Sequence, residues 1–125
     1  MFLSSSLSIV KLAIEQRELS PGLIVICLAG RLMLGPESAD LEALVGTLVG
    51  QGIRKIIIDL SAVTHIDSTG IGRCIASLNK CMAVGAKLHM AGAKGQVREA
   101  FRVTRLDRMF KFFDQVPDAQ AAFGA

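Results

Sequence analysis

The segment from His65 to Gly72 holds the side chains whose types and spacing could do chemistry. Asp67 and Ser68 stand side by side, directly before a stretch with helical periodicity that we expect to begin at about Thr69. The first amides of a helix have no intrahelical partner, and the helix dipole favours negative charge there. A hydroxyl at this place can cap the helix, or it can carry a phosphate that the amides partly neutralise. Ser68 is therefore a candidate phosphorylation site, and simple capping by Asp67 or Ser68 is the alternative.

Two glycines lie in the first turns of this helix. Gly70 and Gly72 lower helix propensity at a place where a helix normally avoids such residues. We therefore expect another backbone to approach closely there. We expect an apolar stripe to face the core, formed by Ile71, Ile75, Leu78 and Met82, with Cys74 beside it. We expect the opposite, outer side to carry Arg73, Ser77 and Lys80.

The elements that position this segment can be read from hydrophobic periodicity and turn signals. The pattern predicts strands at 7–15, 23–28, 55–60, 87–91 and 109–113, with residues 64–67 as a loop. Helices are expected at 38–49, from about 69 to 84, at 95–104 and at 117–123. A turn at 20–22 joins the first two strands as an antiparallel hairpin. The order predicts an α/β fold with a mixed, mostly parallel β-sheet, an N-terminal antiparallel hairpin and about four helices.

Composition limits the class of protein. The 125 residues are 51% hydrophobic and 20% charged, which is typical of one globular domain spanning 1–125, with 1–6 expected as a flexible N-terminus. We read neither a signal peptide nor a membrane-spanning segment. The three cysteines form no CxxC motif and read as buried thiols of a cytoplasmic protein. No residue spacing indicates a metal site, and no cofactor is expected.

The motif at 67–72, Asp-Ser-Thr-Gly-Ile-Gly, together with Ile58-Asp59-Leu60-Ser61 before it, resembles the signature of the STAS domain of anti-sigma factor antagonists. The similarity continues at 85–88 and between 97 and 110, so it covers most of the chain from Leu23 onward. The resemblance implies that a partner anti-sigma kinase phosphorylates Ser68. The unphosphorylated protein would bind the anti-sigma factor and free the sigma factor, and phosphorylation would release it, regulating transcription indirectly.

The resemblance also implies a partner and a surface. The expected partner is an anti-sigma factor of the GHKL serine kinase type, with no direct nucleic-acid contact, no membrane insertion and no enzymatic activity, and a homodimer is compatible with the sequence. Asp67 would position Ser68 and be recognised by the kinase. The expected partner-binding residues are Asp67, Thr69, Gly70, Ile71, Gly72, Arg73, Ser77 and Lys80.

One stretch departs from the family pattern. Related antagonists usually carry Gly-Glu-Leu-Asp after the second strand, whereas this chain reads Gly30-Arg31-Leu32-Met33. The acidic residues are replaced, so a partner contact normally made there is not transferred to this chain. This change leaves room for an alternative function, a constitutive STAS adaptor subunit of a membrane transport ATPase or signalling scaffold.

Two further alternatives belong to other classes. His65, three residues before Ser68, could act as a base for a serine hydrolase, although no Gly-x-Ser-x-Gly motif supports this. The region 87–111 carries seven Lys and Arg against two acidic residues, a net charge of +5, which could indicate nucleic-acid binding. The ridge that would bind is Lys94, Arg98, Arg102 and Arg105.

Overall fold

The computed structural model describes residues 12–124, so the expected flexible segment at 1–6 and the first part of the expected strand at 7–15 lie outside the described residues. The described chain contains five strands, β1 (Leu12–Ser20), β2 (Leu23–Leu32), β3 (Lys55–Ile66), β4 (Lys87–Ala91) and β5 (Lys111–Phe113). Its helices are α2 (Pro36–Gly50), α3 (Ser68–Ala83), α4 (Gly95–Val103) and α5 (Val116–Ala121), with a 3₁₀ turn η1 (Leu106–Arg108) that was not predicted.

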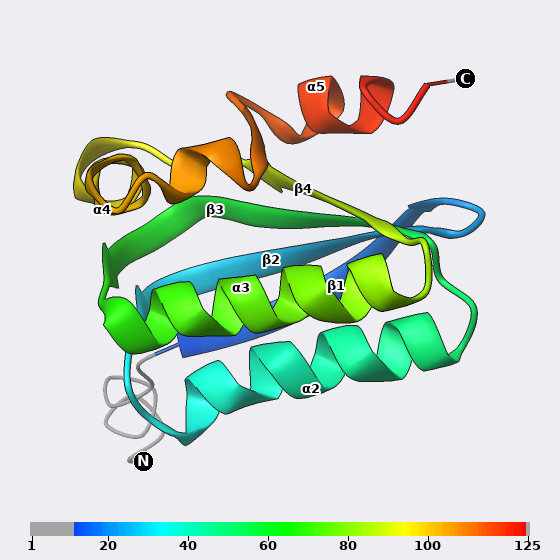
Figure 1. The fold of residues 1–125 in the computed structure, drawn as a ribbon. Coiled ribbons are helices and arrows are strands. Elements are labelled where there is room, and N and C mark those ends of the chain that lie inside the picture. The colour runs from blue at the N-terminus through cyan, green and yellow to red at the C-terminus, as the bar shows by residue number, and fades with distance from the viewer. Residues whose placement is uncertain (1–11, 125) are drawn as a thin grey trace, which may run out of the picture.

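The strands form one sheet in the order β1-β2-β3-β4-β5 (Figure 1). β1 and β2 pair antiparallel, as the turn at 20–22 predicts, and every later pair is parallel. Each parallel pair is joined through a helix, which is the connection that parallel strands require. The predicted mixed, mostly parallel sheet with an N-terminal hairpin is confirmed.

The central strands are longer than expected, and the prediction of a loop at 64–67 is wrong for its first three residues. β3 continues to Ile66 because β2 also continues to Leu32, and the two pair as far as Arg31 with His65 and Leu32 with Ile66. The register shifts twice along this extension, and Gly30, with φ 108°, takes a conformation there that other residues avoid. Periodicity could not reveal these bulges, since each one reverses the alternation of side chains.

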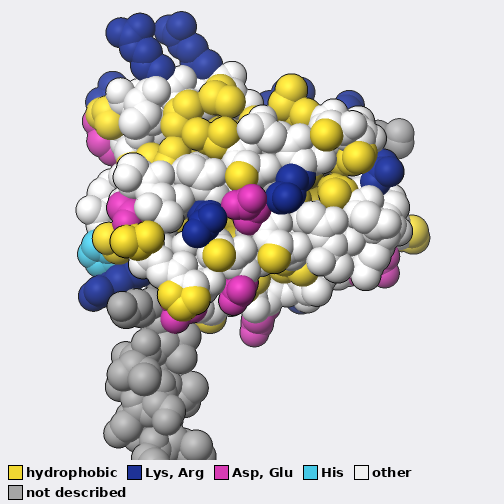
Figure 2. Space-filling view, turned by 60° about the horizontal axis from the view of Figure 1, so that its bottom comes forward, with side chains coloured by type: hydrophobic (Ala, Val, Ile, Leu, Met, Phe, Trp, Pro, Cys, Tyr) yellow, Lys and Arg dark blue, Asp and Glu magenta, His cyan; other side chains and the backbone are white. Residues whose placement is uncertain are grey.

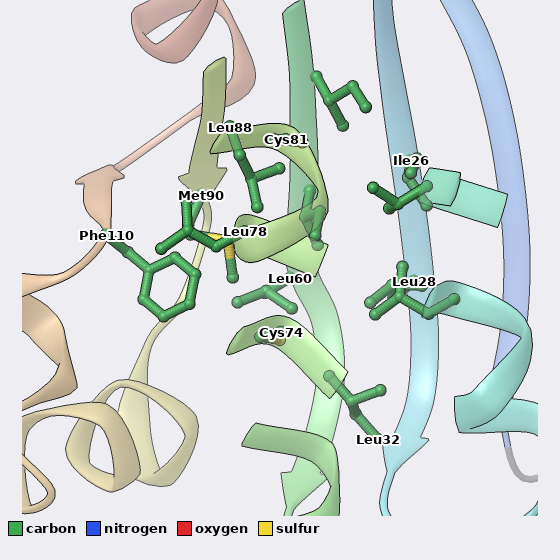
Figure 3. Close-up of a cluster of buried hydrophobic side chains, with 14 of the residues drawn as sticks. Ile26, Leu28, Leu32, Leu60, Cys74, Leu78, Cys81, Leu88, Met90 and Phe110 are labelled. Atoms are coloured by element: carbon green, nitrogen blue, oxygen red, sulfur yellow. The ribbon is translucent and has the colours of Figure 1, made fainter. Parts of the chain in front are cut away.

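Two helices cover one face of the sheet and one covers the other. α2 and α3 lie side by side on the first face and α5 lies on the opposite face (Figure 1). The larger core fills the space under α2 and α3, and α4 adds Val97 and Phe101 to it. Close up, side chains of α3 point toward those of β3 and β4, including Leu60, Leu88 and Met90 (Figure 3). This packing fixes α3, and with it the segment around Ser68.

The predicted core stripe of α3 is partly wrong. Met82 is 66% exposed and Ile75 is half-buried. The buried side chains are instead Ile71, Cys74, Ser77, Leu78 and Cys81. Because α2 packs beside α3 on the same face, the buried side of α3 is turned toward α2, and small residues occupy the tight space between the helices.

The cysteines are free thiols, two of them buried as predicted. Cys74 and Cys81 are buried, and Cys27 is half-buried. Burial raises the pKa of Cys74 to about 12 and that of Cys81 to about 11. Both thiols are therefore protonated and unreactive at neutral pH.

The smaller core holds the second histidine. His89 of β4 is 2% exposed, stacks on Phe123 at 3.9 Å between ring centroids, and donates Nδ1–H to the carbonyl of Ala119 at 3.0 Å. Burial is the main reason that the pKa of His89 lies below its ordinary value, and the charges of Lys111 and Lys87 lower it further, against the raising effect of the Ala119 bond. This packing gives His89 a structural role.

Acidification should therefore destabilise the fold through His89. Below about pH 6.5 the unfolded chain takes up a proton at this position while the folded chain resists it, so the free energy of unfolding falls as the pH falls from 7.5 to 5. Urea titrations across this range should show a flatter pH dependence in His89→Asn. The control variant His65→Asn changes the other histidine, which is exposed. Its free energy of unfolding should depend on pH as that of the wild type does. Equal slopes in wild type and His89→Asn would contradict this assignment.

Candidate functional site

Ser68 is exposed and is the first residue of α3, one position before the predicted start of the helix. β3 ends at Ile66, so the chain passes from a central strand into the helix through Asp67 alone. The site lies at the carboxyl end of a parallel strand, where α/β sheets present ligands and partners. The hydroxyl is thus placed at a helix N-terminus and is open to a second protein.

Asp67 caps the helix and also holds a neighbouring loop. Its Oδ1 accepts the amide of Gly70 at 2.8 Å, which makes Asp67 the N-cap, and its Oδ2 accepts the amide of Leu34 at 3.0 Å. Leu34 lies in the segment between β2 and α2, far away in sequence. One carboxylate therefore joins two segments at the side of Ser68.

These amide bonds also decide the charge of Asp67. Burial raises its pKa, but the hydrogen bonds from backbone amides, led by those of Gly70 and Leu34, lower it by more, so that the pKa lies below its ordinary value. The carboxylate is negative throughout the neutral range. A phosphate on Ser68 would stand next to this fixed negative charge.

The two glycines have different roles. A Cβ on Gly70 would lie 1.9 Å from the carbonyl oxygen of Leu32, so the expected close approach of a backbone is confirmed at this residue. A Cβ on Gly72 would meet nothing within 4 Å, so the same expectation is wrong there. Gly70 is buried and Gly72 is exposed, which leaves only Gly72 accessible to a partner.

The residues expected on the outer side of α3 face α2 instead. Ser77 is fully buried and donates its hydroxyl to the carbonyl of Arg73 at 2.8 Å. Arg73 reaches Glu42 of α2 at 3.3 Å, and Lys80 reaches the same carboxylate at 4.0 Å. Figure 2 shows this alternation of basic and acidic side chains at the centre of the helical face. The prediction that these three residues form the outer surface is wrong for Ser77, and the other two are half-buried at the edge of α2.

The remaining predicted partner-binding residues divide by exposure. Ile71 is buried in the core, and Thr69 is half-buried. The outward stripe of α3 that begins at Ser68 continues instead through Gly72 and Asn79, with Ile75 half-buried between them. Spacing of three and four residues from Ser68 could have identified this stripe.

A pocket beside Asp67 was not expected from the sequence. Leu34 is 74% exposed although its amide is held by Asp67, so an apolar side chain is fixed in solvent next to the site. Residues 30–33 were expected to follow the second strand, but the first three of them belong to β2. The pocket measures about 170 Å³ and is lined by Arg31, Met33, Leu34, Glu37, Ser38 and Asp67.

The geometry around His65 gives little support to the serine hydrolase alternative. The exposed His65 places Nδ1 2.9 Å from the hydroxyl of Thr64, its own neighbour. The described residues include no group of three or more His, Cys, Asp or Glu that could hold a metal ion. In the described chain, no helix is long and apolar enough to cross a membrane.

The predicted basic ridge is not one continuous surface. The guanidinium carbon of Arg98 lies 4.0 Å from the centre of the Phe112 ring, and Arg102 is paired with Glu99. Arg105 lies beyond the end of α4, with φ 62°. Only part of the charge is therefore free to meet the phosphates of a nucleic acid.

Comparisons with known proteins agree with the motif. The model of the STAS domain family matches residues 15–119. The chain is 26% identical over 102 residues to BtrV of Bordetella bronchiseptica, named as an anti-sigma factor antagonist, covering 82% of this chain and 87% of the relative. It is also 26% identical over 98 residues to the anti-sigma-F factor antagonist RsfB of Mycobacterium tuberculosis, covering 78% and 79%.

The fold recurs in a solved structure. The crystal structure of an anti-sigma factor antagonist from Mycobacterium paratuberculosis superposes with a TM-score of 0.76, at 24% identity, over 90% of this chain and 93% of that chain. At this identity the similarity establishes the fold alone.

Alanine at the two glycines should have opposite effects. Gly70→Ala should lower the free energy of unfolding by about 1–3 kcal/mol, because its methyl group would displace the backbone of Leu32. Gly72→Ala should raise it by about 0.5–1 kcal/mol, since the site is open and alanine favours the helix. Urea denaturation measures both. A stable Gly70→Ala protein would show that the close approach is absent.

Removal of the Asp67 carboxylate should loosen both segments that it joins. Asp67→Ala should cost about 1–2 kcal/mol through the lost cap. Asp67→Asn keeps one acceptor oxygen, so it should lower the free energy of unfolding by less. Hydrogen exchange should accelerate at the Leu34 amide, the Gly70 amide or both in each of the two variants. Unchanged exchange at both amides in Asp67→Ala would refute the bridge.

Proposed function

Because this chain is a member of the STAS domain family, we propose that it is an anti-sigma factor antagonist whose binding is controlled by phosphorylation of Ser68. With a free Ser68 it binds an anti-sigma factor in the cytoplasm, and with a phosphorylated Ser68 it is released. The observation that carries the proposal is the exposed hydroxyl at the start of α3, next to a carboxylate that is already bonded to two amides.

The switch works through charge at one helix terminus. A phosphate adds about −1.5 to −2 charges and three acceptor oxygens. Asp67 already takes the Gly70 amide, one of the donors at the N-terminus of α3, so a phosphate on Ser68 meets a like charge there. When a partner excludes water from this surface, the lost solvation of the phosphate and its repulsion from Asp67 each disfavour binding by about 1–3 kcal/mol. Two such terms weaken binding by about two decades, without refolding of the domain.

The proposed contact surface has Ser68 at its centre. It combines Gly72 on the outward stripe of α3 with Leu34, the exposed apolar side chain that Asp67 holds in place. Asp67 and Thr69 support it, and Arg73 and Lys80 border it where they pair with α2. The buried Gly70, Ile71 and Ser77 hold the fold beneath it and are not contacts.

The proposed partner is an anti-sigma factor of the GHKL serine kinase type, which is both the bound protein and the kinase. The names of BtrV and RsfB as antagonists support the first role, and the accessibility of Ser68 supports the second. The chain then acts as a binding protein and substrate of the kinase, with no catalysis of its own. It regulates transcription by freeing a sigma factor.

The experiment compares Ser68 variants of the full chain as baits in extracts of cells that carry its gene. Ser68→Ala should retain a GHKL-type anti-sigma kinase, and Ser68→Glu should bind the same purified kinase about 100-fold more weakly. With ATP, the kinase should place phosphate on Ser68 of the wild type, mapped by mass spectrometry. Thr69→Ala, which removes the neighbouring hydroxyl, should be phosphorylated normally.

Two outcomes would overturn the proposal. Phosphate that persists in Ser68→Ala would place the modification elsewhere. Recovery of a transport ATPase and no kinase, with equal affinity for the Ala and Glu variants, would favour the constitutive adaptor.

A further inference from the structure

A groove lies at the other end of α3, between the last turns of that helix and the beginnings of β4 and β5. It measures about 220 Å³, and its lining residues are Leu78, Met82, Ala86, Lys87, Leu88, His89, Met109 and Lys111. α3 has 16 residues and is therefore about 24 Å long. The groove is thus well separated from Ser68, and a partner that fills it need not touch the switch.

Exposed methionines form the apolar part of the groove. Met82, in the last turn of α3, is 66% exposed, and Met109, just after η1, is 47% exposed. Leu78 and Leu88 continue the apolar surface inward. Methionine side chains adapt their shape to different partners and are frequent at binding surfaces.

The charged part of the groove is positive. Lys87 and Lys111 line it, and no carboxylate is among the described residues that do so. Both lysines belong to the stretch 87–111, whose net charge is +5. Their positive charges add to the effect of burial in lowering the pKa of His89, another residue that lines the groove. A ligand that pairs with this groove therefore carries negative charge.

The size and charge select among possible occupants. The volume is below the roughly 300–1,000 Å³ of small-molecule pockets, so it suits a side chain of a larger partner. A symmetric contact with a second copy, centred on this groove, would bring the lysines at 87 and 111 of both copies close together, which is repulsive. Apolar groups bounded by cations fit an amphipathic protein segment with an apolar side chain and flanking carboxylates.

We propose that the groove between Met82 and Met109 is a docking site for an acidic amphipathic segment of a partner protein. An apolar side chain of that segment contacts the two methionines, and its carboxylates pair with Lys87 and Lys111. The site goes beyond the switch at Ser68 and is independent of its phosphorylation.

The test uses ¹⁵N-labelled full chain and two synthetic helical peptides with the same leucine face, one with glutamate and one with lysine on the other face. The glutamate peptide should shift amide signals at 82–89 and 109–111 and leave Ser68 unaffected, and the lysine peptide should bind at least about tenfold more weakly. Met82→Glu and the double variant Lys87→Glu/Lys111→Glu should each weaken binding of the glutamate peptide about tenfold. Val103→Glu, at another residue that is 63% exposed but outside the groove, is the matched control and should bind normally.

Several results would overturn the proposal. Shifts that map to another surface, or equal binding of both peptides, would refute the site. Stronger binding to phosphatidylserine vesicles than to the glutamate peptide, lost in Met82→Glu, would assign the groove to a membrane surface. A dimer in sedimentation that Met82→Glu dissociates would assign it to a second copy. None of these results bears on phosphorylation of Ser68.

Discussion

The end of β2 crosses the start of α3 so closely that only a residue without a side chain fits between them. Gly70 lies beneath the carbonyl of Leu32, and the Asp67 carboxylate joins the amides of Gly70 and Leu34 directly beside this crossing. Both contacts depend on the bulged extension of β2 and β3. The position of Ser68 therefore follows from the close packing of β2 against α3 and from the half-buried carboxylate of Asp67.

This crossing explains why a small chemical change at Ser68 has a large effect on binding. The helix N-terminus offers few free donors, and Asp67 already uses the Gly70 amide for structure. An added phosphate stands beside the negative Asp67 and is stabilised largely by water. A partner that covers the surface removes that water, whereas the isolated domain keeps it, so the charge acts on the complex.

α3 also divides the surface of the domain into regions with different roles. One side is closed by α2, where Glu42 neutralises Arg73 and approaches Lys80. The start of the helix carries the switch, and its last turn contributes Met82 to the positive groove. Because α3 is packed on the sheet throughout its length, both ends are rigidly placed, and two partners could occupy them together.

The sequence alone determined the order of the elements, the mixed sheet with its hairpin, and the Asp-Ser-Thr-Gly-Ile-Gly motif, since turn residues and periodicity are local properties. Tertiary structure decided the rest. The bulges of β2, the burial of Ser77, the exposure of Leu34 and the place of Met82 and Met109 in one groove all depend on neighbours distant in the chain. Gly70 shows this difference between sequence and structure most clearly. A glycine at this place in the helix predicted the close approach of another backbone, and only the fold revealed that this backbone is that of Leu32.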